Sequence, residues 1–164
     1  MIKQIKIKAD NEPGSLRKYV SLLSSGGVNI KALEVSERGG GDFGHIHLIV
    51  SDIDKATEAL RAGGVNFEIV DVLAVEMDDQ VGGLTTILDV LRKGGFNINY
   101  LYAFLGRVAG KSLAVFSVAD LKKAKGLIEE AGMRVMCQET IEREADKEPF
   151  KVSSNDHFGK DFIW

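Results

Sequence analysis

Two glycines that each precede a predicted helix are the residues best placed to bind a ligand. Gly14 ends the sequence NEPG and Gly82 ends DQVG, and apolar residues at helical spacing follow both. The first backbone N–H groups of a helix lack intrahelical acceptors and lie at the positive end of its dipole. Because glycine lets an anion approach closely, both segments are predicted to bind a carboxylate.

Polar side chains accompany both glycines. Asn11 and Asn29 each carry a carbonyl that accepts from an ammonium group and an amide that donates to a carboxylate, whereas an ionised Asp79 only accepts. Asn97 takes the place of Asn29 in the second half of the chain. The alternative is structural: Asn11 caps the helix, Pro13 fixes the approach of the chain, and the other two asparagines are turn residues.

Other groups of residues favour metal binding or catalysis much less. His45 and His47 share one face of a predicted strand, but no carboxylate or cysteine recurs nearby, and Leu113 and Val115 replace them in the second half. We therefore expect no metal site. No nucleophile has an apparent base and no phosphate loop precedes a helix, so we expect no catalytic residues, no enzyme activity and no cofactor.

These residues belong to an internal duplication, since residues 2–67 align with residues 70–135 without a gap. Periodicity predicts the same β-α-β-β-α-β order in each copy. In the first copy the predicted elements are a strand over 3–9, a helix over 15–25, strands over 28–36 and 46–50 around a glycine-rich turn over 38–44, a helix capped by Asp52, and a strand over 67–71. The predicted fold is α+β, a ferredoxin-like βαββαβ sandwich in two tandem copies.

The expected domains are residues 1–68 and 69–141, followed by a C-terminal tail over 142–164. Residues 70–77 join the copies without a linker rich in proline, serine or charge, so we expect rigid coupling. Both helices of each copy cover one sheet face, and the other copy is a candidate to cover the opposite face. The sheet face away from the helices is more apolar in the second copy. On the third strand of each copy, the residues of this face are His45, His47 and Ile49 in the first copy and Leu113, Val115 and Ser117 in the second.

Three aromatic residues alternate along a strand of the second copy: Tyr100, Tyr102 and Phe104. One interpretation is an aromatic platform of the kind found on RNA-binding sheets. Their spacing continues from Phe96 and Ile98, which are expected to face the helices, so core packing against the helices is the favoured interpretation.

Composition limits the classes of partner. The 164 residues carry a formal net charge of −3, without the basic footprint that a phosphate backbone requires, so no nucleic-acid partner is expected. Neither a long apolar stretch nor a signal peptide is evident, so we expect a soluble cytoplasmic protein with no membrane partner. The lone Cys137 is expected to be a small core residue, and the apolar residues between Phe150 and Trp164 are expected to dock.

The loops resemble the ACT domain family, which is marked by Asn or Asp, two residues, Gly and an aliphatic residue, and after the helix by GVNI. The first copy has NEPGSL and GVNI; the second has DQVGGL and GFNI, so that Val81 replaces Pro13 and Asp79 replaces Asn11. The resemblance covers residues 2 to about 141. It implies that amino acids bind at the interface between paired domains, held by the loop before the first helix and by polar residues at the start of the second strand.

The residues that the resemblance assigns to ligand binding are Asn11, Pro13, Gly14, Ser15, Leu16, Asn29, Asp79, Val81, Gly82, Gly83, Leu84 and Asn97. It implies a regulatory or sensor protein without catalysis of its own, and a homodimer. The alternative hypothesis is a structural or protein-protein interaction module of the same fold whose ligand sites have decayed.

Overall fold

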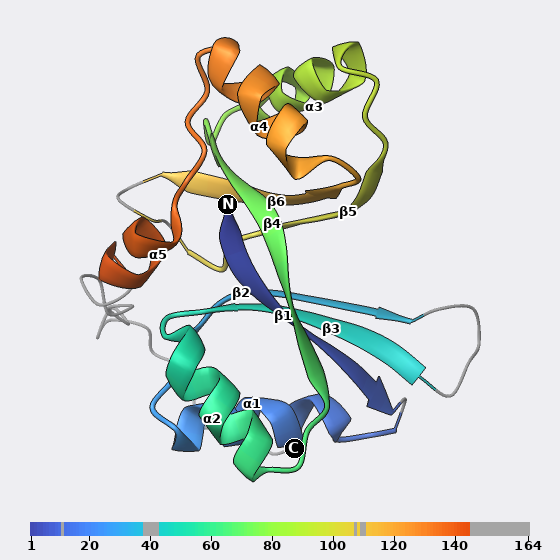
Figure 1. The fold of residues 1–164 in the computed structure, drawn as a ribbon, viewed down its shortest axis with the longest axis vertical. Coiled ribbons are helices and arrows are strands. Elements are labelled where there is room, and N and C mark those ends of the chain that lie inside the picture. The colour runs from blue at the N-terminus through green and yellow to red at the C-terminus, as the bar shows by residue number, and fades with distance from the viewer. Residues whose placement is uncertain (11, 38–42, 107, 109–110, 145–164) are drawn as a thin grey trace, which may run out of the picture.

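The computed structural model describes residues 1–10, 12–37, 43–106, 108 and 111–144. In chain order the elements are β1 (Ile2–Asp10), α1 (Ser15–Ser25), β2 (Ile30–Glu37), β3 (Phe43–Val50), α2 (Ile53–Ala62), β4 (Phe67–Met77), α3 (Gly83–Lys93), β5 (Ile98–Ala103), β6 (Ser112–Val118), α4 (Leu121–Glu130) and α5 (Gln138–Glu144) (Figure 1). The α+β class and the tandem ferredoxin-like repeats are confirmed.

The strands form one antiparallel sheet in the order β2-β3-β1-β4-β6-β5. One of its two central strands, β4, serves both repeats: it pairs with β1 up to Val72 and with β6 from Leu73 onward. The two repeats are therefore joined through a shared strand, as the absence of a linker suggested. The expected boundary between residues 68 and 69 lies near the start of this strand.

The last strand expected in the second repeat is reduced to a short segment. Val135 forms an isolated bridge with Val75, and Met136 N donates to Ala74 O over 2.8 Å. This segment lies on the same edge of β4 as β1, because β6 occupies the other edge. Since β1 covers that edge up to Val72, only a few positions are left for pairing.

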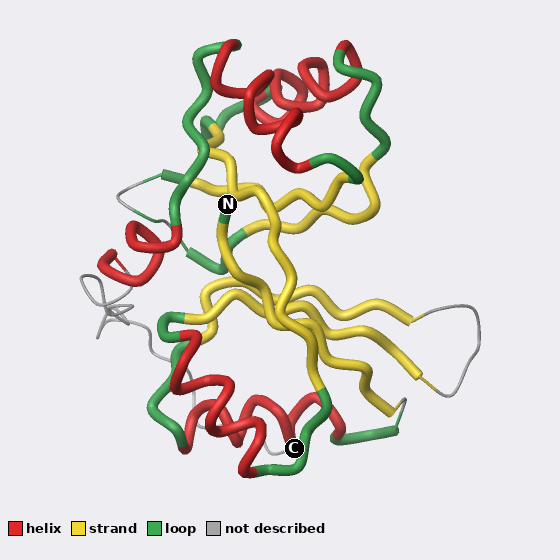
Figure 2. The backbone as a smooth tube through the Cα atoms, viewed as in Figure 1, coloured by secondary structure: helices red, strands yellow, loops and turns green. Residues whose placement is uncertain are grey.

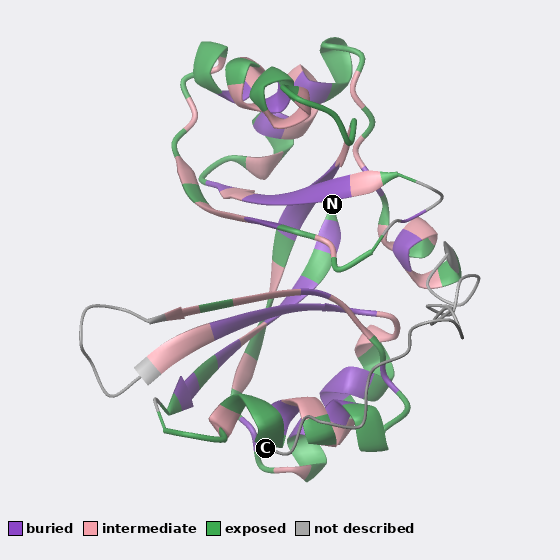
Figure 3. Ribbon diagram, turned by 180° about the vertical axis from the view of Figure 1, so that it is seen from behind, coloured by how far each residue is buried: buried purple, intermediate pink, exposed green. Residues whose placement is uncertain are grey.

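Helices α1 to α4 form two layers at opposite ends of the molecule with the sheet between them, and α5 lies to one side (Figure 2). The pair α1 and α2 covers a core under the first repeat, and α3 and α4 cover a second core. A third core lies between the backs of the two half-sheets, where Figure 3 shows buried strand segments in the middle of the molecule. It contains Ile49, Leu113 and Val115, so the expectation that the repeats cover each other's backs is confirmed.

One prediction about the second repeat is wrong: Tyr100, Tyr102 and Phe104 pack into the central core and not against the helices. The reason is a β-bulge. Ile98 pairs with Val118 and Tyr100 with Ser117, so one extra residue of β5 lies between successive pairs and reverses the faces of the residues that follow. The sheet also curls, so that the two edge strands meet at one end, where Leu105 N donates to Lys31 O over 2.8 Å.

Cys137 is exposed, so the prediction that it is a core residue is also wrong. It lies just before α5, with its sulfur 3.1 Å from Thr140 Oγ1, outside the three cores. Most of the predicted glycine-rich turn and the apolar C-terminal residues lie outside the described residues, as does Asn11. No helix within the described ranges is both long and apolar enough to span a membrane.

Candidate functional site

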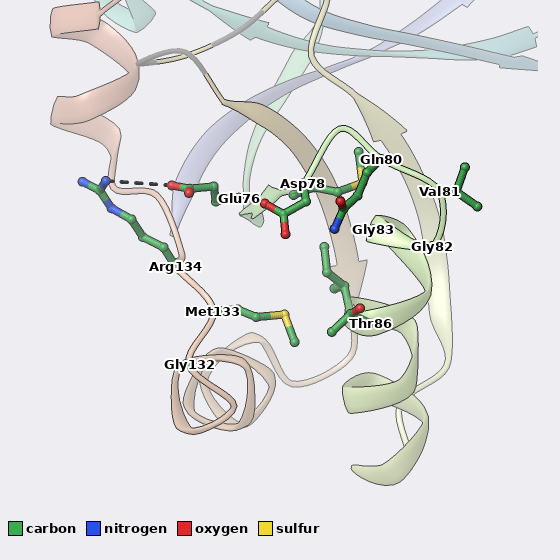
Figure 4. Close-up of a pocket in the computed structure, with 12 residues that line it drawn as sticks. Glu76, Asp78, Gln80, Val81, Gly82, Gly83, Thr86, Gly132, Met133 and Arg134 are labelled. Carbon is green, nitrogen blue, oxygen red and sulfur yellow. Dashed lines mark ion pairs between the residues drawn. The ribbon is translucent and has the colours of Figure 1, made fainter.

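The glycine loop of the second repeat borders a pocket of about 330 Å³ (Figure 4). The end of β4, the loop that follows it, the first turn of α3 and the segment after α4 form its walls. The residues that line it are Glu76, Met77, Asp78, Gln80, Val81, Gly82, Gly83, Thr86, Ile87, Gly132, Met133 and Arg134.

Local backbone geometry explains why glycines form this loop. Gly82 precedes α3 in the left-handed region, with φ of 87°, and no side chain caps the helix. Gly83 N donates to Gln80 O over 3.0 Å, which closes a tight turn. A Cβ at Gly83 would collide with the backbone carbonyl of Asp78, so only glycine fits there.

The charged groups of the pocket are distributed unevenly. Glu76 lies 3.3 Å from Lys111 Nζ and 3.9 Å from an Arg134 guanidinium nitrogen, so its charge is compensated. Asp78 has no hydrogen bond or ion pair from its side chain to any described residue, and Figure 4 shows its carboxylate inside the pocket. A carboxylate thus faces the uncapped start of a helix. This arrangement suits a ligand with both a cationic and an anionic group.

The structure brings only part of the predicted second-repeat set to this pocket. Val81, Gly82 and Gly83 line it, whereas Asp79, Leu84 and Asn97 do not. Leu84 instead packs against the core beneath α3.

Of the residues predicted in the first repeat, Gly14, Ser15 and Leu16 lie at the start of α1, in the helical layer at the far end of the molecule (Figure 1). Gly14 again precedes a helix without a side-chain cap, with φ of 93°, and Pro13 is exposed in the loop before it. Ser15 and Leu16 begin α1, and Asn29 N donates to Ser51 Oγ over 3.0 Å. Within one chain, therefore, the two glycine loops are not brought together.

Sequence reasoning missed several residues of the pocket. Asp78 and Gly132 could have been found from the sequence, because each is identical to its counterpart in the first repeat, Asp10 and Gly64. No sequence pattern marks Arg134, because it belongs to the segment after α4, which lies beside the loop only in the folded sheet.

A family model for the ACT domain pair matches residues 1–144. The chain belongs to this family. The resemblance drawn from the glycine loops is thereby confirmed.

Solved structures agree on the fold of this ACT domain pair. Protein BT0572 from Bacteroides thetaiotaomicron is 27% identical with a TM-score of 0.76, and the match covers 87% of this chain and 96% of that one. The ligand-free regulatory subunit of aspartate kinase from Thermus thermophilus is 15% identical with a TM-score of 0.55, over 79% of this chain and 91% of that one. A search of curated proteins finds no match.

Proposed function

We propose that this ACT domain pair is a regulatory module that binds an amino acid at its glycine loop and catalyses no reaction. The observation that carries the proposal is the second-repeat pocket, in which Gly82 and Gly83 lie opposite the carboxylate of Asp78. An α-amino acid carries the two charges that this arrangement suits. Family membership supports the same function, and one structural neighbour is itself a regulatory subunit of aspartate kinase.

In this proposal the ligand carboxylate lies at the uncapped start of α3 and the ammonium group lies near Asp78. Backbone N–H groups at a helix start bind anions, and an ionised carboxylate accepts hydrogen bonds from an ammonium group. The pocket volume of about 330 Å³ is at the small end of the range for ligand sites, which suits a compact metabolite.

The proposed assembly is a homodimer of soluble, cytoplasmic chains, each with domains over 1–68 and 69–141 and a tail over 142–164. The two glycine loops of one chain lie at opposite ends of the molecule, so a ligand that bridges two such loops needs a second chain. Ligand binding at such an interface would change association or rigidity, which is how a regulatory module transmits a signal.

A protein-protein interaction module is the second candidate function. Val81 at the tip of the glycine loop is fully exposed, so an apolar side chain is available there for contact with another protein. In that case amino acids would not bind, so ligand binding separates the two candidates.

Calorimetry of the full chain with each of the twenty amino acids tests the proposal. We expect at least one to bind, and we expect Gly83→Ala to weaken binding by about tenfold or more, because the added methyl group displaces the Asp78 carbonyl and reshapes the loop. Gly126→Ala is the matched control, since Gly126 lies in α4 and a Cβ there meets nothing within 4 Å.

The absence of heat and of any thermal shift with every amino acid at millimolar concentration would refute the sensor function. If Gly83→Ala left the affinity unchanged, the ligand would have to bind somewhere other than the second-repeat pocket.

A further inference from the structure

A second cavity, of about 600 Å³, lies between the backs of the two half-sheets, beside the central core. None of its lining residues is shared with the glycine-loop pocket. Each strand of the sheet contributes at least one lining residue, among them Lys6, Glu34, His47, Asp71, Tyr100 and Ser117. We call it the inter-sheet cavity.

A pair of β-bulges creates the polar lining. In β2 the register shifts between Ile30 and Ala32, as it does between Ile98 and Tyr100 in β5. Ile30 packs under the helices, but after the bulge Ala32 lies in the central core and Glu34 borders the inter-sheet cavity. The same irregularity at the same place in both repeats thus turns Glu34 and Tyr100 toward each other across the gap.

His47 lies at this meeting point with its hydrogen-bonding capacity unused. Its side chain is only 6% exposed, its ring stacks on Tyr100 with centroids 4.3 Å apart, and its Nδ1 lies 2.7 Å from Glu34 Oε2. That contact lacks hydrogen-bond geometry, so Glu34 Oε2 and both ring nitrogens have no hydrogen-bond partner among the described residues. Buried polar atoms without partners are rare in folded proteins and call for an explanation.

The charged residues that line the inter-sheet cavity differ in how well their charges are compensated. Lys6 lies 3.4 Å from Glu68, and Asp71 lies 2.8 Å from Lys3, so these charges are compensated at the cavity rim. Among the described residues the ion-pair contact of Glu34 is with His47, and burial lowers the pKa of His47 below its ordinary value of 6.5, despite the opposing effect of Glu34. Burial thus disfavours the cationic form of the imidazole, which makes His47 a poor counter-charge for the Glu34 carboxylate.

The opposite wall is held in place by a buried hydrogen-bond chain. Gln4, which is fully buried, donates from Nε2 to Tyr100 Oη over 2.8 Å, and Tyr102 Oη donates to Gln4 Oε1 over 2.7 Å. Because both acceptor and donor groups of Gln4 are used, Tyr100 is fixed before any ligand arrives. Such a preformed wall is typical of binding sites.

We propose that the inter-sheet cavity is a second ligand site, which takes a small molecule carrying an ammonium group. The ammonium group would donate to Glu34 and supply the missing positive charge, while the hydroxyl of Ser117 and the amide of Asn99 offer further polar contacts. This site does not depend on the glycine-loop pocket. Both simple amines and amino acids carry the required group.

Nuclear magnetic resonance on the full chain tests the site, with 1,4-diaminobutane, ethanolamine and the twenty amino acids as probes. We expect at least one probe to shift the ring signals of His47 and the side-chain amide signals of Asn99. A response to the amines alone identifies an amine site, and a response to amino acids identifies an amino-acid site; both support the proposal.

Variants then locate the contact. We expect Glu34→Gln to weaken binding by about tenfold or more, since it removes a charged acceptor. Glu58→Gln is the matched control, because Glu58 is exposed on α2, on the far side of the first half-sheet, and should leave binding unchanged. Ser117→Ala replaces Glu34→Gln if that variant fails to fold.

Gly83→Ala separates this proposal from the function proposed above, because it should weaken binding at the glycine loop and leave the His47 shifts intact. The proposal is overturned if no probe shifts the His47 and Asn99 signals at millimolar concentration. It is equally overturned if Gly83→Ala removes those shifts, or if Glu34→Gln and Ser117→Ala both leave them unchanged.

Discussion

His47 is enclosed between the two half-sheets, where the surroundings disfavour its charged form. Burial lowers the pKa of its imidazole, an effect that nearby Glu34 opposes and that His45 and Lys6 reinforce. Within the part of the chain that the structure describes, the ion-pair contact of Glu34 is with this same histidine. One histidine therefore links the proposed inter-sheet site to the stability of the protein.

The pH dependence of unfolding follows from this lowered pKa. Below about pH 6.5 the imidazole takes up a proton in the unfolded chain but resists protonation in the folded one. The free energy of unfolding should therefore fall as the pH drops through 6.5, until the lower folded-state pKa is reached. Urea unfolding between pH 5 and pH 7.5 measures this slope.

His47→Gln should reduce that slope, because glutamine cannot take up the proton. His45→Gln is the control, since it changes the same residue type on the same strand of the first repeat. A slope that persists in His47→Gln and disappears in His45→Gln would contradict the assignment.

The bulges in β2 and β5 decide which side chains of these strands face the helices and which face the other repeat. In β5 the residues after the bulge alternate between two cores: Tyr100 and Tyr102 enter the central one and Leu101 the one under α3 and α4. Tyr102 reaches Gln4 on β1, so this contact joins an edge strand of one repeat to a central strand of the other.

Tyr102→Phe should lower the free energy of unfolding by about 1–3 kcal/mol, because it leaves the buried Oε1 of Gln4 without its donor. Burial raises the pKa of the Tyr102 phenol far above its ordinary value, so the hydroxyl remains a donor across the accessible pH range. Tyr19→Phe provides the control, since Tyr19 is equally buried under the first repeat's helices. Equal losses for both variants would show that the cross-repeat hydrogen bond contributes nothing specific.

The two repeats are coupled through β4, which pairs with strands of both, and through the central core, which neither repeat could bury alone. Separate unfolding of one repeat would expose that core and half of a shared strand. The molecule should therefore unfold as one cooperative unit.

Leu23→Ala and Leu91→Ala test this cooperativity, since these fully buried residues hold equivalent places under the two helical layers. Each should lower the free energy of unfolding by about 2–5 kcal/mol through the cavity it leaves. Both should move one common transition, seen by calorimetry and by circular dichroism. Two transitions, with each variant moving only one, would contradict the coupling.

The amino-acid sequence by itself determined the duplication, the element order of each repeat and the glycine loops, because these depend on local periodicity and on residues such as Gly14 and Gly82. It also indicated that the repeats cover each other's backs, from the apolar Leu113 and Val115. The tertiary structure decided what depends on contacts distant in the chain: the place of Arg134 beside the loop and the short pairing of Val135. It also decided the faces of Tyr100 and Glu34, because a bulge reverses the alternation from which a strand's faces are predicted.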